Sequence, residues 1–232
     1  MTLNVERRRI DSQPIEVRSE GNDHVAYGYA YRFGTLSQNL GGFVETIERS
    51  AGAKSIGEHD IRALYNHDPN KVLGRNRSGT LRLEEDRDGC LYEIRLPDTQ
   101  TGREVRELLE RGDVSGSSFG FSTILDEWSE TEEGFPLRTL KAFRLYDVGP
   151  VTFPAYLDAD SAMRTDNALR SLAESRNLDP AAVLKAAADN DLAAVLRGDN
   201  ATTERDEDRS QTIHRPKARQ FALPRQGANP SN

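Results

Sequence analysis

Four serines and three glycines stand together in the stretch GDVSGSSFGFS, residues 112–122. A serine hydroxyl is a poor nucleophile at its own pKa, so a catalytic serine needs a base and a third group that orients the base. Alternation along a strand puts the two phenylalanines on one face and Ser118 on the other, between two glycines that leave room for another backbone. Ser118 is therefore the candidate nucleophile. Ser115 and Ser117, on the face of the aromatic rings, are the alternatives.

The letters around Ser118 also match the G-x-S-x-G pattern of α/β-hydrolases. That pattern needs a strand, a sharp turn and then a helix, whereas here the alternation continues to Ile124. Those hydrolases also place the histidine after the serine, and the only later histidine is His214, near the end of the chain. We therefore exclude an α/β-hydrolase.

A base must come from one of four histidines, which are His24, His59, His67 and His214. His67 ends an apolar approach, IRALYN, just before an Asp68-Pro69 turn. A residue at the end of a regular element, held by a turn, is fixed and still reaches solvent. His67 is the candidate base, and the alternative is a turn histidine that bonds Asp68.

Asp147 is the candidate orienting acid. Simple alternation in the strand LKAFRLYDV puts it on the apolar face of Phe143 and Leu145, where a carboxylate is costly unless it is paired. Its partner could be a histidine ring N–H, as in a Ser-His-Asp triad, or an arginine. The candidate arginines are Arg32, Arg138 and Arg144, and the rival acids are Asp68, Asp113 and Asp126.

The composition limits the other functions. The 232 residues carry a formal charge of −7 at a pI of about 5.3, so no basic field indicates nucleic acid. A single cysteine, Cys90, excludes an internal disulfide and is expected to be a small core residue. We see no secretory signal, apolar membrane span, metal-ligand cluster or phosphate-binding loop, and we expect a soluble intracellular protein without cofactor or metal.

These side chains need a rigid frame, and the pattern predicts one that is mainly β. Alternating apolar residues predict a strand at 25–33 and two long strands at 114–128 and 140–153. Turn signals between alternating runs predict a hairpin at 79–98, and a short apolar stripe predicts a helix at 101–113. The expected class is α+β, mainly β, an antiparallel sheet or barrel with packed helices.

The last third of the chain has a different character. Residues 161–177 are helix-like, and 178–198 follow with Asp179 as N-cap, Pro180 in the first turn and Gly198 as a stop. Residues 199–232 have few large apolar side chains and are expected to be a disordered tail.

Together these segments resemble a known family. LGGFVETIERSA, ALYNHDPNKVLGR, the run from LRLEEDRDG to GDVSGSSFGF, and LYDVGPVTFPAY are similar, in order and spacing, to the prohead proteases of tailed bacteriophages. These serine proteases of capsid maturation are related in fold to the herpesvirus assemblins. The resemblance covers about residues 25–157, and it implies Ser118 as nucleophile, His67 as base and Asp147 as third member.

The resemblance implies a function and an organisation. We expect an endopeptidase that cleaves the scaffold segment of the major capsid protein precursor, and itself, inside procapsids in the host cytoplasm. No nucleic acid or membrane partner is expected, and the formation of a homo-oligomer is an open alternative. The expected parts are an N-terminal arm (1–22), a protease domain (23–157), a helical extension (158–198) and a tail (199–232). The alternatives are a non-catalytic scaffolding protein that keeps this fold and a generic cytosolic peptidase or esterase.

Overall fold

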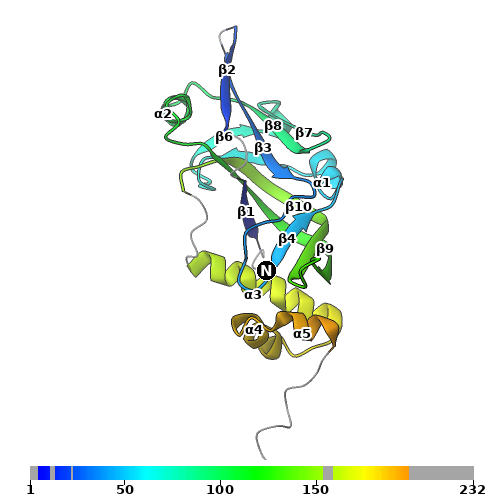
Figure 1. Ribbon diagram of the computed structural model, residues 1–232. Coiled ribbons are helices and arrows are strands. Elements are labelled where there is room, and N and C mark those ends of the chain that lie inside the picture. The colour runs from blue at the N-terminus through cyan, green and yellow to red at the C-terminus, as the bar shows by residue number, and fades with distance from the viewer. Residues whose placement is uncertain (1–4, 11–13, 22, 154–158, 199–232) are drawn as a thin grey trace, which may run out of the picture. The chain divides into compact units, whose positions relative to one another are not determined.

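The computed structural model describes residues 5–10, 14–21, 23–153 and 159–198, which form two β-sheets and a set of helices (Figure 1). The first sheet has the order β1-β9-β10-β5-β6, and β4 also pairs with β10. Its strands are β1 (Glu6–Ile10), β4 (Val44–Ile47), β5 (Arg62–Leu64), β6 (Val72–Arg75), β9 (Gly116–Glu130) and β10 (Pro136–Val151). The second sheet has the order β2-β3-β8-β7, with β2 (Glu16–Glu20), β3 (Asp23–Arg32), β7 (Leu81–Glu85) and β8 (Gly89–Arg95).

The long hairpin of β9 and β10 organises the first sheet. It pairs antiparallel from Pro136 opposite Glu130 to Val151 opposite Gly116. β4 and β5 run parallel to β10, so this sheet is mixed. The predicted class, mainly β with packed helices, is confirmed, and the long strands and the hairpin lie where the alternation predicted them.

The main core lies between the two sheets. Tyr31 from β3 contacts Phe119 and Phe143 from the first sheet, with ring centroids 5.3 and 5.2 Å apart. Phe121 stacks beside Phe119 on the same strand. Such aromatic pairs add to the free energy of burial and fix the register of the strands that carry them. The core thus holds β9 rigidly at the point where its serines lie.

Three short helical elements connect the strands: α1 (Ala53–Glu58), the 3₁₀ turn η1 (Asn76–Ser78) and α2 (Gln100–Glu110). α2 is the predicted short helix. The hydroxyl of Thr99 caps the first turn of α2 by accepting a hydrogen bond from the Gly102 N–H, and the apolar stripe of the helix buries Val105 and Leu109.

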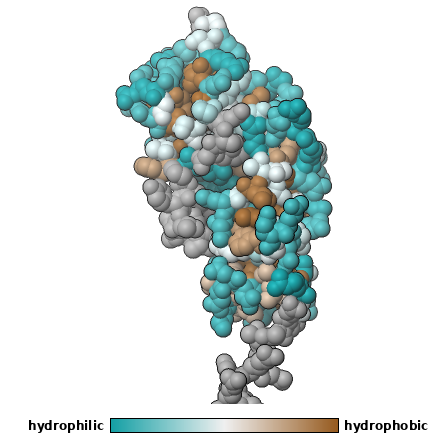
Figure 2. Space-filling view, viewed as in Figure 1, coloured by the Kyte–Doolittle hydropathy of each residue, from teal (hydrophilic) through white to brown (hydrophobic). Residues whose placement is uncertain are grey.

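Most of the face in Figure 2 is hydrophilic, with hydrophobic residues gathered in separate patches.

The C-terminal helices are α3 (Ala159–Arg176), α4 (Pro180–Ala188) and α5 (Leu192–Arg197). They gather near β4 and the turn end of the β9–β10 hairpin (Figure 1). Leu169 and Leu172 of α3 form a second apolar cluster with Phe43 and Trp128, whose rings are 4.9 Å apart. None of the helices in the described ranges is long and apolar enough to cross a membrane.

Two features of the expected organisation took another form. Asp179 caps α4 as predicted, but that helix ends at Ala188, and a turn with Asn190 at positive φ separates it from α5. The segment 1–22, expected as an arm, contributes β1 to the first sheet and β2 to the second. The expected tail lies outside the described residues, and the division into four parts stays a prediction.

Candidate active site

Ser118 lies in β9, directly opposite Gly149 of β10. Its neighbour Ser117 points into the core, where it donates a hydrogen bond of 3.0 Å to the hydroxyl of Tyr92. The two serines therefore face opposite sides of the sheet, as alternation along the strand predicted. Ser117 is buried and bonded to Tyr92, whereas Ser118 faces the side of the sheet on which His67 lies.

His67 is held by an unusual turn at the end of β5. Asn66 and His67 both have positive φ, 54° and 55°, a region that few residues other than glycine adopt. The turn is held to the end of β10, a few residues beyond Asp147. The Asn66 N–H donates to the Pro150 carbonyl at 3.0 Å. The Asn66 side-chain amide accepts from the Thr152 N–H at 2.8 Å and donates to the Thr152 hydroxyl at 3.0 Å. Asn66 is thus a positioning residue for His67. The sequence signal for it is the Asn-His-Asp-Pro turn, since asparagine tolerates the left-handed region.

Asp147 reaches the same place through a β-bulge. Leu145 lies opposite Phe121 and Asp147 lies opposite Gly120, so two residues of β10 advance over one residue of β9. The alternation that put Asp147 on the apolar face of Leu145 was therefore wrong, because the bulge turns the carboxylate to the face of Ser118.

The glycines of β9 have a reason other than the expected approach of a substrate backbone. A side-chain carbon on Gly120 would collide with the Asp147 carboxylate, and one on Gly116 would collide with the guanidinium of Arg9. These two side chains occupy the room that the glycines leave. A glycine at position 120 is therefore required by the position of Asp147.

The three side chains form one hydrogen-bonded line. His67 Nε2 lies 2.7 Å from Ser118 Oγ, and His67 Nδ1 contacts Asp147 Oδ1. The His67 and Asp147 side chains are only 10% and 11% exposed, so water competes little for these bonds. A carboxylate on Nδ1 fixes the tautomer with Nδ1–H, which leaves the Nε2 lone pair free to take a proton from the serine.

The rival acids are engaged elsewhere. Asp68 accepts a backbone N–H within its own turn, and Asp113 pairs with a neighbouring arginine at the surface. Asp126 accepts from Arg138 Nε at 2.6 Å, so Arg138, a candidate partner for Asp147, is occupied away from it. Asp147 is therefore the acid that meets His67.

The other histidines do not reach Ser118 in the described part of the chain. His24 lies 3.4 Å from the hydroxyl of Ser19, and His59 lies 2.9 Å from that of Ser55. His214 lies outside the described residues. His67 is the histidine that contacts the candidate nucleophile.

Cys90 is buried in the core, as expected of a small core residue. Burial raises the pKa of its thiol to about 12, so it is not a thiolate at neutral pH. Within the described ranges, no group of three or more His, Cys, Asp and Glu side chains has the arrangement of a metal site.

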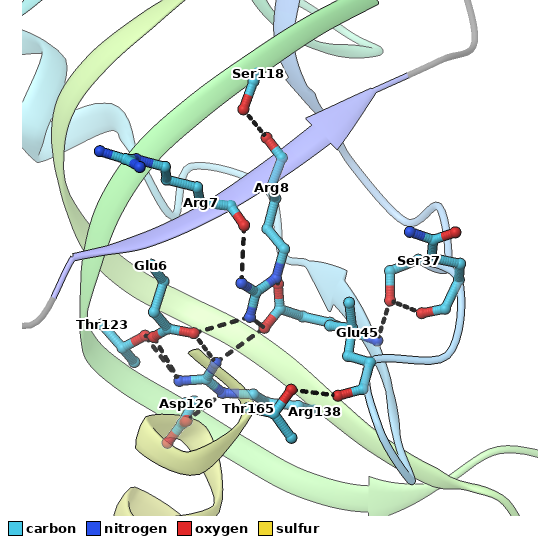
Figure 3. A network of polar contacts seen from close by, with 12 residues as sticks. Glu6, Arg7, Arg8, Ser37, Glu45, Ser118, Thr123, Asp126, Arg138 and Thr165 are labelled. Carbon is cyan, nitrogen blue, oxygen red and sulfur yellow. Dashed lines mark hydrogen bonds and ion pairs between the residues drawn. The ribbon is translucent and has the colours of Figure 1, made fainter. Parts of the chain in front are cut away.

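A buried ionic cluster lies next to Ser118, and the sequence analysis missed it (Figure 3). Arg138, fully buried on β10, contacts Glu6 of β1 at 2.7 Å, Glu45 of β4 at 2.9 Å and Asp126 of β9 at 2.6 Å. Arg8 joins them through Glu45 at 2.8 Å and Glu6 at 2.8 Å. We call these five residues the ionic cluster.

Burial and neighbouring charges act in opposite directions on the pKa values of the ionic cluster. Burial raises the pKa of the Glu6 carboxyl, but the charges of Arg138 and Arg8 outweigh this effect and lower it to about 2. Burial likewise disfavours the charged form of Arg138, and its carboxylate partners, Glu6 and Glu45 above all, outweigh that effect and raise its pKa. Glu6 and Arg138 are therefore charged at neutral pH, and the five residues of the cluster join four strands at one point.

A serine, a histidine and a carboxylate joined in this order have the geometry of a serine protease. The model of the caudovirus prohead serine protease family matches residues 13–172, which is more than half of the chain, and the protein belongs to this family. It is thus a protease of phage capsid maturation, as the resemblance predicted.

Among solved structures, the bacteriophage T4 capsid assembly protease, gp21, is similar to this chain. It is 13% identical, and the match covers 65% of this chain and 96% of that one with a TM-score of 0.41. No curated protein matches the chain.

Proposed function

We propose that the protein is a serine endopeptidase that cleaves the scaffold segment of the major capsid protein precursor inside assembling procapsids in the host cytoplasm. Membership of the prohead protease family supports the setting and the class of partner. The single observation that carries the chemistry is the line from Ser118 through His67 to Asp147, with 2.7 Å between Ser118 Oγ and His67 Nε2.

Each residue of the line has one role. Ser118 Oγ attacks the scissile carbonyl carbon while His67 Nε2 takes its proton, and the tetrahedral intermediate collapses as His67 returns that proton to the leaving amine. Water then attacks the acyl-enzyme with His67 as base again, which releases the acid product and restores the serine. Asp147 holds Nδ1–H throughout and stabilises the imidazolium that forms twice in the cycle.

Burial and rigidity support these roles. The bulge positions Asp147 and the Asn66 turn positions His67, so little reorganisation is needed when the imidazolium forms. The bulge lies in β10 and the turn follows β5, which pairs with β10 at Asp147.

Co-expression with the capsid precursor tests the proposal. Wild type is expected to give precursor fragments in intact-mass spectra, and Ser118→Ala none. Ser115→Ala is the matched control, because Ser115 is exposed and precedes β9. A serine-reactive fluorophosphonate should label wild type at Ser118 alone. Intact precursor and no labelling in folded wild type would favour the non-catalytic scaffolding protein.

We also propose that the residues after about 158 carry the chain into the procapsid and are trimmed by the protease. Supporting this, α3 to α5 form a packed unit on Trp128 and Phe43, separate from the main core. A packed helix must open before a protease can cut it, so trimming within α3 to α5 requires this unit to open first.

A further inference from the structure

The strand β1 lies along the catalytic strand in the manner of a bound peptide. It pairs antiparallel with β9, with Arg9 opposite Ser118, Arg8 opposite Phe119 and Ile10 opposite Ser117. It is the edge strand of its sheet, and without it β9 would present an open edge at Ser118. An extended peptide binds such an edge by main-chain hydrogen bonds. β1 also precedes residue 13, where the family match begins.

β1 covers the nucleophile and accepts a hydrogen bond from its hydroxyl. The Ser118 hydroxyl donates to the Arg8 carbonyl oxygen at 2.8 Å (Figure 3), and Ser118 is only 4% exposed. A hydroxyl has one hydrogen, so the Arg8 carbonyl competes with His67 Nε2 for the proton that catalysis must transfer.

The contact is also unproductive. During attack, the carbonyl carbon meets the serine oxygen while the carbonyl oxygen turns to oxyanion donors. Here the carbonyl oxygen itself accepts from the nucleophile. β1 therefore occupies the site in the manner of an inhibitor. Arg8 takes the place of the substrate residue whose carbonyl would lie at Ser118.

The Arg8 side chain is largely buried against the rest of the protein. Its Nε and Nη2 contact the two carboxylate oxygens of Glu45 on β4, at 2.8 and 3.0 Å, and its guanidinium lies 5.5 Å from the Phe121 ring centroid. The Glu45 side chain is 3% exposed. A planar fork on a buried carboxylate is the geometry that favours arginine over lysine.

Charge in the ionic cluster favours a cationic side chain beside Glu45. Glu6 and Arg8 both come from β1, and their charges cancel. The remaining members are Glu45, Asp126 and Arg138, so the cluster has one more carboxylate than guanidinium both with and without β1. An excess of carboxylates attracts a cationic side chain.

We propose that β1 occupies the substrate-strand site as an intramolecular inhibitor, and that Glu45 selects an arginine at the substrate residue whose carbonyl lies at Ser118. The substrate is then an extended peptide segment that is cut after arginine. β1 must leave the edge of β9 before such a segment enters. This inference rests on the proposed serine protease function.

The test compares the full chain, Arg8→Ala and a form lacking residues 1–10, with Arg18→Ala as control because Arg18 makes an exposed ion pair on β2. The readout is the rate of fluorophosphonate labelling at Ser118. We expect at least a tenfold rise for Arg8→Ala and for the shortened form, and no change for Arg18→Ala. Arg8→Ala keeps the test decisive if the shortened form does not fold.

A synthetic peptide of residues 4–11 is then added to the variant that labels fastest. It should slow labelling, and the same peptide with Arg8→Gln should bind at least tenfold more weakly. In a Glu45→Gln background the two peptides should bind equally, because the carboxylate that distinguishes them is gone.

The outcomes separate the two proposals. Equal labelling of Ser118 in the full chain and in Arg8→Ala would overturn the inhibitory role of β1 and leave the protease intact. A preference for the arginine peptide that persists in Glu45→Gln would overturn the role of Glu45. Absence of labelling in every folded variant would instead refute the serine protease function.

Discussion

Gly120→Ala adds one carbon atom at the point where β9 meets the orienting acid. The new carbon would overlap Asp147 Oδ2 at a separation that side-chain carbons do not show. A normal contact of about 3.5 Å requires the carboxylate to move by about 1 Å. Its hydrogen bond to His67 Nδ1 does not survive such a movement.

The cost to catalysis follows from that displacement. A misplacement of about 1 Å costs on the order of 10²-fold in rate, and complete loss of the orienting acid costs on the order of 10⁴-fold in other serine proteases. We therefore expect Gly120→Ala to lower kcat/KM by about 10²- to 10⁴-fold. The fold should persist, because the obstacle is a side chain at the rim of the core and not backbone.

The assay measures the initial rate of capsid precursor cleavage and the midpoint of thermal unfolding for each variant. Gly57→Ala is the matched control: it makes the same change in α1, where an added carbon would meet nothing within 4 Å. Gly57→Ala should keep full activity. Full activity in Gly120→Ala, with an unchanged unfolding midpoint, would refute the role of Asp147 in holding His67.

Three further predictions follow from the same geometry. Asp147→Asn should keep the fold and lower kcat/KM by on the order of 10⁴-fold, because the amide permits the wrong histidine tautomer, whereas Asp68→Asn should remain active; the reverse pattern would assign the acid to Asp68. Stability should fall in acid: the pKa of Glu6 is about 2 against an ordinary 4.5, so its contribution, about 3 kcal/mol, is present above pH 4.5 and is lost as pH falls from there towards 2. Urea unfolding between pH 2 and 7 should show this loss in wild type and a weaker one in Glu6→Gln, and parallel curves would contradict it. Intact masses over time should show a C-terminally shortened species in wild type and none in Ser118→Ala; equal shortening in both would assign the cut to a host protease.

The placement of Ser118 could be predicted from sequence because β9 is regular there. Alternation needs only an unbroken strand, and Phe119 and Phe121 mark the core face without ambiguity. His67 could be predicted for a related reason, since an Asn-His-Asp-Pro turn after an apolar run fixes where an element ends. Both inferences used local information.

The face of Asp147 could not be predicted in this way. A bulge shifts the alternation by one residue, and nothing in the letters RLYDVG marks Tyr146 as the extra residue. The clue lay on the partner strand, where Gly120 provides the room that the carboxylate needs. The required information was therefore a pairing between two strands, which alternation within one strand does not contain.

The ionic cluster is harder still, because its members are far apart in the chain and look like surface residues. The sequence of β1, ERRRI, is typical of a polar edge strand. The chain has 31 basic and 38 acidic residues, so the sequence does not indicate which charges pair with those of β1. Burying five charges is costly unless all are paired, so the arrangement is stable only when β1, β4, β9 and β10 meet in one register. The same requirement fixes β1 on β9 with the Arg8 carbonyl at Ser118. Main-chain pairing with β9 and the paired charges of the ionic cluster together hold β1 beside Ser118. Under the proposal that β1 is an inhibitor, a substrate strand replaces both kinds of contact when it carries an arginine at the position of Arg8.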